Sequence, residues 1–310
     1  MTPYEFDPEL APLVPRMARI DYTDVETARK ALREITAAMP RYEPREPVAA
    51  EQRVVPGEHP VPVRVYRPAG AARALPGVVY LHGGGFVLGD LDMVDSVATR
   101  VADLAEVVVV SVDYRLAPEH PFPAGLQDCY AALEWAVAEA ADLGIDADRV
   151  GVAGESAGGG LAAALTLLTR DRGGPRLRHQ CLVNPELDDR LDTPSARAFV
   201  DTPKWDRDNA VASWRHYLGD ALGEDAVPEL AAPARAADLA GLPSAFVSAG
   251  EFDPLRDEAI SFAHRLIQAG VRTELRYYPG TFHASYTAPA AVSRQMLADQ
   301  VDAIRRALHA

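Results

Sequence analysis

Ser156 stands in a setting typical of a catalytic nucleophile. It is the centre of Gly154-Glu155-Ser156-Ala157-Gly158, which lies between the apolar run 149–153 and the small, apolar stretch 159–168. The run predicts a buried strand and the stretch a buried helix, so the motif falls on a tight strand-to-helix turn. Such a turn lifts the serine hydroxyl away from the sheet and needs glycine where the two segments approach closely. We interpret Ser156 as a nucleophile; the alternative is a glycine-rich turn with an incidental serine.

A second glycine-rich stretch could supply the amides that such a nucleophile needs. His82-Gly83-Gly84-Gly85-Phe86 follows the apolar run 78–81. Three glycines after a strand allow the backbone N–H groups to turn inward, as an oxyanion hole requires. A flexible turn or a phosphate-binding loop would be the alternatives, but the Gly-Lys-Ser/Thr ending of a phosphate loop is absent. Together with Ser156, the stretch favours an oxyanion hole.

A nucleophilic serine also needs a general base and a group that orients this base. Among the eight histidines, His283 comes just after the predicted strand 273–278, and Asp253 comes just after the predicted strand 244–249. The carboxyl ends of parallel strands meet at one edge of an open sheet, where functional sites assemble. The chain order Ser156, Asp253, His283 therefore predicts a Ser-His-Asp triad. Asp257 and Glu258 fall in the following helix, where we expect them to cap or charge its first turn.

These residues need a parallel sheet to position them. Apolar runs such as 107–112 and 179–184 alternate with predicted helices over 92–105, 124–142, 156–170, 256–269 and 290–308. This alternation indicates an α/β fold whose sheet is covered on both faces. The segments 52–55 and 61–66 predict a hairpin at a sheet edge. Residues 1–45 look helical and amphipathic, and 186–235 interrupts the alternation as an insertion over the sheet.

Composition narrows the class of protein. The 310-residue chain carries a formal net charge of −14, which argues against binding to nucleic acid or anionic membranes. No apolar run approaches the ~20 residues of a membrane span, and no secretory signal is evident at the N-terminus. Cys129 and Cys181 lie in apolar contexts, so we expect buried free thiols and a cytoplasmic location. Neither cysteine has the spacing of a metal ligand, and no metal site is expected.

The motifs together resemble a known family, the bacterial hormone-sensitive-lipase-like (family IV) esterases of the α/β-hydrolase superfamily. The resemblance covers about residues 76–310 and rests on five ordered stretches: 82–86, 113–124, 154–159, 253–258 and His283. It implies an eight-stranded, mostly parallel sheet flanked by helices, with a helical cap. The implied division is N-terminal cap helices over 1–45, the hydrolase core over 46–185 and 236–310, and a cap insertion over 186–235.

The resemblance also implies an activity, the hydrolysis of short-chain carboxylic esters without a cofactor. In the implied mechanism Ser156 attacks, His283 transfers protons, and Asp253 orients His283. The amides of Gly83, Gly84 and Ala157 would hold the oxyanion. An amidase, lactonase or carbamate hydrolase would use the same machinery, and a non-catalytic small-molecule receptor is a further alternative that the filled triad disfavours.

The sequence departs from the family pattern at two positions. Glu155 replaces a frequent Asp before the serine, and Asn184-Pro185 replaces a frequent Tyr-Pro pair. We interpret Glu155 as a structural carboxylate that could instead hold a loop or a water molecule. The change at Asn184 affects the part of the chain from which an acyl pocket would be inferred.

Two expectations concern surfaces beyond the triad. Phe199, Trp205 and Trp214 lie within 186–235, and such rings are costly to expose together, so they either line an acyl pocket or pack the cap onto the core. Residues 272–278 are expected to form the last, edge strand of the sheet. By resemblance to related esterases, this edge predicts a homodimer.

Overall fold

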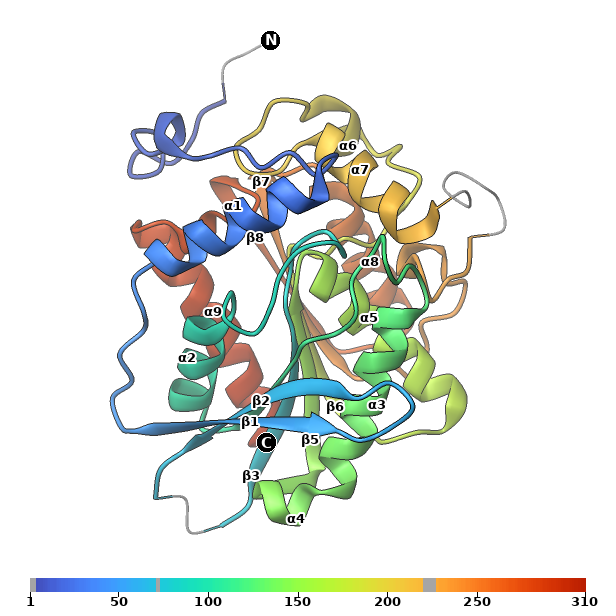
Figure 1. Cartoon of the computed structure of the whole chain (residues 1–310). Helices are drawn as coiled ribbons and strands as arrows, with labels where there is room; N and C mark the ends of the chain where they lie inside the picture. The colour runs from blue at the N-terminus through green and yellow to red at the C-terminus, as the bar shows by residue number, and fades with distance from the viewer. Residues whose placement is uncertain (1–3, 71–72, 220–226) are drawn as a thin grey trace.

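The computed structural model describes residues 4–70, 73–219 and 227–310, and its centre is an eight-stranded sheet (Figure 1). The strand order is β1-β2-β4-β3-β5-β6-β7-β8. The strands are β1 (Val48–Val55), β2 (Val61–Pro68), β3 (Leu75–Leu81), β4 (Val108–Val112), β5 (Ile145–Glu155), β6 (Leu177–Val183), β7 (Ser244–Phe252) and β8 (Thr273–Phe282).

The sheet is parallel from β4 to β8, whereas β2 pairs antiparallel with β1 and with β4. The predicted hairpin is therefore confirmed, with β1 at one edge of the sheet. The predicted last strand is confirmed as β8 at the opposite edge, and it extends to Phe282, four residues beyond the predicted end. Parallel strands end on the same side of the sheet, so the segments that follow β5, β6, β7 and β8 come together there.

Helices cover both faces of the sheet, as the alternating pattern predicts. In β4, Val108 and Val110 point to a core shared with α3, α5 and α8, whereas Val109 points to a core shared with α2 and α9. This alternation follows from the two-residue period of a strand. The helices are α1 (Val25–Ala38), α2 (Asp95–Ala105), α3 (Ala124–Ala138), α4 (Ala140–Leu143), α5 (Ala157–Arg172), α6 (Pro194–Ala198), α7 (Arg207–Leu218), α8 (Arg256–Gln268) and α9 (Ala291–Leu308).

Two helical predictions need correction. The predicted helix 124–142 is interrupted at Glu139 and forms α3 and the short α4. The segment 1–45 contains, among its described residues, α1 and one turn of 3-10 helix at Val14–Arg16 rather than continuous helix. Prolines at positions 8, 12 and 15 explain the difference, because proline lacks the N–H that continues a helix. Asp24 caps α1 by accepting from the Thr27 amide at 3.1 Å.

The N-terminal segment and the 186–235 segment lie on the same side of the sheet. Figure 1 shows α1, α6 and α7 together above the strands. Contacts fix this placement: Arg29 of α1 donates to the Val87 carbonyl at 2.9 Å, and Ser213 of α7 lies 2.9 Å from the Gly85 carbonyl oxygen. Both segments thus cover the glycine-rich loop that follows β3.

Candidate active site

Ser156 lies on a sharp turn between β5 and α5. Its φ of 54° and ψ of −123° are strained for a residue with a side chain. The glycines around it permit close crossings: a Cβ at Gly154 would lie 2.1 Å from the Gly158 carbonyl oxygen. A Cβ at Gly158 would lie 2.2 Å from the Leu81 carbonyl oxygen of β3. The predicted strand-turn-helix setting of the serine is confirmed.

The predicted triad forms one continuous chain of hydrogen bonds. Ser156 Oγ lies 2.9 Å from His283 Nε2, and His283 Nδ1 lies 2.8 Å from Asp253 Oδ2. His283 directly follows β8 and Asp253 directly follows β7. Because the carboxylate only accepts, Nδ1 carries the proton and Nε2 is free to accept the serine proton. The three side chains have the mutual geometry of a nucleophile, a base and an orienting acid.

Asp253 is held by three donors, and one of them was not foreseen as a site residue. The carboxylate is fully buried, and its Oδ1 accepts from the Leu255 amide at 2.9 Å. Asn184 Nδ2 donates to Oδ2 at 3.0 Å, beside the His283 bond. Asn184 follows β6, between the strands that carry Ser156 and Asp253. Its place at a strand end was the available signal, and its side chain supports the acid.

The glycine-rich loop after β3 passes directly beside the nucleophile. A Cβ at Gly83 would lie 3.4 Å from Ser156 Cβ. Gly84 has a φ of +116°, and its carbonyl accepts from the Leu88 amide at 2.8 Å, which closes the turn. Within the described part of the chain, the amides of Gly83 and Gly84 have no acceptor. Ala157 begins α5, so its amide is among those left free at a helix N-terminus.

His82 supports this loop. Its Nδ1 lies 2.8 Å from the Gly83 carbonyl oxygen, so Nδ1 is the protonated nitrogen. The ring stacks on Tyr114 with a centroid separation of 4.1 Å, and the Tyr114 hydroxyl donates to the His82 carbonyl at 2.7 Å. Burial lowers the pKa of His82 to about 4, which keeps the ring neutral. His82 therefore holds backbone, as its position in the motif predicts.

Glu155 connects the nucleophile turn to the loop after His283. Its buried carboxyl accepts from the Tyr80 hydroxyl at 2.5 Å and from the Tyr286 hydroxyl. Gln300 Nε2 donates to the Tyr80 hydroxyl at 3.2 Å. Burial raises the pKa of Glu155 above its ordinary value, against the opposing effect of the two tyrosines. These contacts fit a structural carboxylate, as we interpreted Glu155 from the sequence, and they are also those of the alternative, a carboxylate that holds a loop.

The three aromatic residues expected in the cap lie in different surroundings. Trp205, 2% exposed, lies with its ring centroid 5.5 Å from that of His283, and its ring also approaches Gly85. Trp214 packs on Phe86 at 5.3 Å between centroids. Phe199 packs on Phe252 at 6.1 Å between centroids. Of the three, Trp205 is the one whose ring contacts a triad residue.

Lys204, next to Trp205, ties the 186–235 segment to the histidine loop. Its Nζ donates to the Ala284 carbonyl at 3.2 Å and to the Thr287 hydroxyl. Burial lowers the pKa of Lys204 to about 8. Since Ala284 is the residue after His283, these bonds fix the loop that carries the base.

The contacts of Asp257 and Glu258 differ from the prediction that these residues cap or charge the first turn of their helix. Glu258 lies in the first turn of α8 but does not face solvent. It is buried, and Oε1 accepts from the Leu187 amide at 2.6 Å and the Asp188 amide at 3.2 Å. Asp257 instead accepts from the Ser195 amide at 2.7 Å. Both carboxylates therefore anchor the 186–235 segment to α8.

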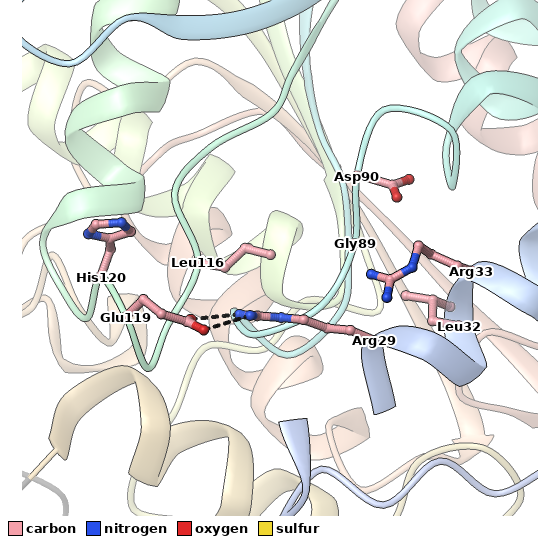
Figure 2. Close-up of a pocket in the computed structure, with 8 residues that line it drawn as sticks. All are labelled: Arg29, Leu32, Arg33, Gly89, Asp90, Leu116, Glu119 and His120. Carbon is pink, nitrogen blue, oxygen red and sulfur yellow. Dashed lines mark hydrogen bonds and ion pairs between the residues drawn. The ribbon is translucent and has the colours of Figure 1, made fainter. Parts of the chain in front are cut away.

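A cavity of about 390 Å³ lies beside α1 rather than at Ser156 (Figure 2). Its lining includes Gly89, whose Cα lies close to the His82 ring. Figure 2 shows Arg29 reaching across to Glu119, with which it forms two hydrogen bonds of 2.7 and 2.8 Å. Arg29 also donates to the carbonyls of Val87 and Ala117. Arg29 therefore holds α1 against the outer side of the glycine-rich loop through these hydrogen bonds.

The described residues contain neither a membrane-spanning helix nor a cluster of metal ligands. No helix among them is long and apolar enough to cross a membrane. In the same part of the chain, no group of three or more His, Cys, Asp or Glu side chains is arranged to hold a metal ion. Cys129 and Cys181 are free and buried, as predicted.

Comparison with known proteins places this geometry in a family. A family model described as the alpha/beta hydrolase fold matches residues 78–287. Carboxylesterase NlhH of Mycobacterium tuberculosis is 43% identical over 294 residues, which cover 92% of this chain and 90% of that protein. The chain belongs to the hormone-sensitive-lipase-like esterases of the α/β-hydrolase superfamily. The predicted family and fold are thereby confirmed.

Other members of the family show the same likeness. The structure titled bacterial heroin esterase superposes with a TM-score of 0.94 at 43% identity and covers 99% of both chains. An arylesterase of Saccharolobus solfataricus is 34% identical over 283 residues, which cover 89% of this chain and 90% of that protein. The similarity therefore spans nearly the whole chain, including the N-terminal and 186–235 segments.

Proposed function

We propose that this chain is a serine carboxylesterase that hydrolyses short-chain carboxylic esters through an acyl-enzyme intermediate. Hydrolysis of carboxylic esters is the reaction class of its family. The observation that carries the proposal is the hydrogen-bonded chain from Ser156 through His283 to Asp253, with distances of 2.9 and 2.8 Å. This arrangement lies beside a glycine-rich loop with unpaired amides, which acyl transfer requires.

The geometry supports the following sequence of steps. Ser156 Oγ attacks the ester carbonyl carbon while its proton passes to His283 Nε2, and Asp253 stabilises the resulting imidazolium. The amides of Gly83, Gly84 and Ala157 stabilise the oxyanion. His283 then protonates the leaving alcohol oxygen. Water, deprotonated by His283, attacks the acyl-enzyme and releases the carboxylic acid and free Ser156.

The preference for short chains is supported by the enclosure of the site. Ser156 is 7% exposed and His283 is 5% exposed. We assign this enclosure to a cap built from the described residues of the two predicted cap segments, 4–45, 186–219 and 227–235, in which Trp205 lies against His283; residues 1–3 and 220–226 of these segments lie outside the described residues. A narrow, apolar enclosure favours small acyl groups and excludes bulk water from the acyl-enzyme. The free, buried thiols support a reducing cytoplasm as the place of action.

The nucleophile is tested by labelling and by substitution. A small organophosphonate should modify Ser156, as mass spectrometry of the labelled peptide would show. Ser156→Ala should lower kcat by roughly 10⁶-fold, whereas Ala at the exposed Ser261 of α8 should change little. Labelling at another residue, or an active Ser156→Ala enzyme, would contradict the proposal.

The substrate class is tested with a matched panel. We expect p-nitrophenyl acetate and butyrate to be hydrolysed with higher kcat/KM than the corresponding anilide or a lactone. The amide and lactone arms test the amidase and lactonase alternatives on the same triad. A higher kcat/KM for the anilide or the lactone than for the esters would contradict the proposed ester preference and favour an amidase or a lactonase.

Assembly through the β8 edge stays a prediction. The edge position of β8 and the 43% exposure of Tyr277 support pairing of two copies along this strand. Light scattering at micromolar concentration should give the mass of a dimer. The mass of a monomer would contradict the predicted dimer.

A further inference from the structure

Glu186 is a buried carboxyl group at the junction of the nucleophile, the glycine-rich loop and the cap. Its backbone amide donates to the Ser156 carbonyl at 3.0 Å. A Cβ at Gly160 of α5 would lie 2.1 Å from its carbonyl oxygen, so this backbone is packed tightly on the nucleophile helix. The residue is 0% exposed. Neither the motifs nor the mechanism above gives this carboxyl a role.

Ser213 of α7 links the carboxyl to the loop. Its Oγ lies 3.0 Å from Glu186 Oε1 and 2.9 Å from the Gly85 carbonyl oxygen. A hydroxyl has a single proton and cannot donate to both oxygens. The Gly85 carbonyl can only accept, so Ser213 satisfies it by donating. The contact with Glu186 is then a hydrogen bond only if Glu186 supplies the proton.

The second carboxyl oxygen agrees with this assignment. Glu186 Oε2 is buried and has no hydrogen-bond partner in the described part of the chain. A buried, unpaired anionic oxygen is far more costly than an unpaired oxygen of a neutral acid. Tyr22 and Trp205 lie at the same junction, since a Cβ at Gly85 would meet each of their rings at 2.9 Å. The carboxyl is therefore shielded from solvent at a junction lined by aromatic rings.

We propose that Glu186 is a positioning residue for ester hydrolysis: as a neutral acid it donates to Ser213, which donates to the Gly85 carbonyl, and this chain holds the oxyanion loop. This inference rests on the proposed function. Gly85 directly follows the two glycines whose amides bind the oxyanion. Loss of the Ser213 bond would let the Gly85 peptide rotate and misplace those amides. Neither Glu186 nor Ser213 touches the reacting atoms.

The electrostatic setting favours the neutral acid. Burial raises the pKa of Glu186 to about 8, against a lowering effect of the Ser213 contact and with a smaller raising effect of the Asp253 carboxylate. Glu258 on α8, itself buried with a raised pKa, acts on Glu186 as another acidic neighbour. The hydroxyls of Tyr22, Tyr114 and Tyr217 are further neighbours whose pKa values the Glu186 carboxylate raises. All of these neighbours are acids, so they disfavour a charge on Glu186.

Ionisation of Glu186 would have two effects. The carboxylate would draw the Ser213 proton to itself, which leaves the Gly85 carbonyl without its donor. It would also place a negative charge near the position where the oxyanion forms. Both effects act on the transition state, so they lower kcat and change KM little.

The test is the pH dependence of kcat for p-nitrophenyl butyrate, corrected for spontaneous hydrolysis. If the ionised form is inactive, wild-type kcat should fall about tenfold between pH 7 and pH 9, since the protonated fraction falls from about 10/11 to about 1/11. Glu186→Gln replaces the acid proton with an amide N–H that does not titrate. It should keep kcat within about threefold at pH 7 and remove the alkaline fall. The acidic limb set by the base serves as an internal reference.

Two control variants test whether a titratable group other than Glu186 causes the alkaline fall in kcat. Lys204→Gln removes the amine whose pKa is about 8, and Glu258→Gln neutralises the neighbouring buried carboxyl. Both variants should keep the alkaline fall. If Lys204→Gln removes it while Glu186→Gln does not, the proton belongs to Lys204 and the inference is wrong.

Ser213→Ala keeps the inference testable if Glu186→Gln does not fold. It should lower kcat about tenfold at pH 7 and make the alkaline fall clearly smaller than in the wild type, because the ionised carboxyl can no longer act on Gly85 and retains only the effect of its charge. Two results would overturn the proposed chain of hydrogen bonds from Glu186 through Ser213 to Gly85. One is an alkaline fall in Ser213→Ala as large as in the wild type. The other is a folded Glu186→Gln enzyme whose kcat at pH 7 is more than about a hundredfold lower. Failure of the proposed function is distinct, because it would show as activity that survives Ser156→Ala.

Discussion

Removal of the Trp205 indole should widen the substrate site, whereas removal of the Trp214 indole should not. Both side chains are almost fully buried, at 2% and 0% exposure, so the two alanine variants form a matched pair. Each should lose about 3–5 kcal/mol of unfolding free energy through the cavity left behind. Only the Trp205 cavity opens onto His283, because the two rings lie 5.5 Å apart between centroids.

The size of the effect follows from the burial of methylene groups. Each methylene that enters the new space contributes about 0.8 kcal/mol to transition-state binding. Two further methylenes therefore raise the hexanoate-to-butyrate ratio of kcat/KM by roughly 15-fold in Trp205→Ala. Trp214→Ala should keep the wild-type ratio, since its ring packs on Phe86 and Tyr217.

The assay is a series of p-nitrophenyl esters from acetate to decanoate, measured well below the Tm of the least stable variant. Titration with a small phosphonate gives the concentration of reactive Ser156 in each sample, so that loss of folded protein is not mistaken for loss of specificity. An unchanged profile in Trp205→Ala would refute the reasoning and assign the ring to packing alone. Equal shifts in both variants would also refute it.

Asp253→Asn should lower kcat by on the order of 10⁴-fold, because the amide favours the wrong His283 tautomer, and Asp257→Asn should cost little; steady-state kinetics compare them. Gly160→Ala should prevent folding, since its Cβ would lie 2.1 Å from the Glu186 carbonyl oxygen, and a stable, soluble variant would contradict this. Glu186 retains its proton up to about pH 8 when folded, against an ordinary pKa of 4.5. The unfolding free energy of the wild type should therefore fall, relative to Glu186→Gln, by about 1.4 kcal/mol per pH unit between these values, as urea unfolding at several pH values would show. Because the triad supplies nucleophile and proton transfer without a metal, EDTA should leave activity intact; loss that zinc restores would count against the mechanism.

The sequence was sufficient for the fold and for the placement of the triad. Apolar runs alternate with helical segments, and this pattern admits few arrangements other than a covered parallel sheet. Once the strands are placed, Ser156, Asp253 and His283 each follow a strand end, and parallel strands bring those ends together. The glycines of the two motifs, 82–86 and 154–158, also indicate where the site lies, because they mark positions at which two backbone segments approach closely.

The supporting residues could not be predicted, because their roles depend on burial that only the folded chain creates. Glu186 stands in Pro185-Glu186-Leu187-Asp188-Asp189, a stretch whose composition is typical of a solvated loop. Asn184 stands at a predicted strand end, but nothing in the sequence shows that its partner is Asp253, 69 residues away. Lys204 is a polar residue of a segment with no periodic pattern, and its partner Ala284 lies 80 residues away in the chain. Local sequence holds no signal for contacts at such separations.

The distances along the chain between the triad residues also constrain how the protein folds. Ser156 and His283 are 127 residues apart, and each reaches the site only through parallel pairings that close long loops. β8, which carries His283, is the last strand in the chain and pairs only with β7 at the edge of the sheet. A refolding chain can therefore recover most of its helix while it has no competent base. The onset of hydrolysis during refolding therefore reports completion of the sheet. The rate of hydrolysis measures the fraction of fully folded molecules, whereas a spectroscopic signal from helices also includes molecules in which β8 has not yet paired.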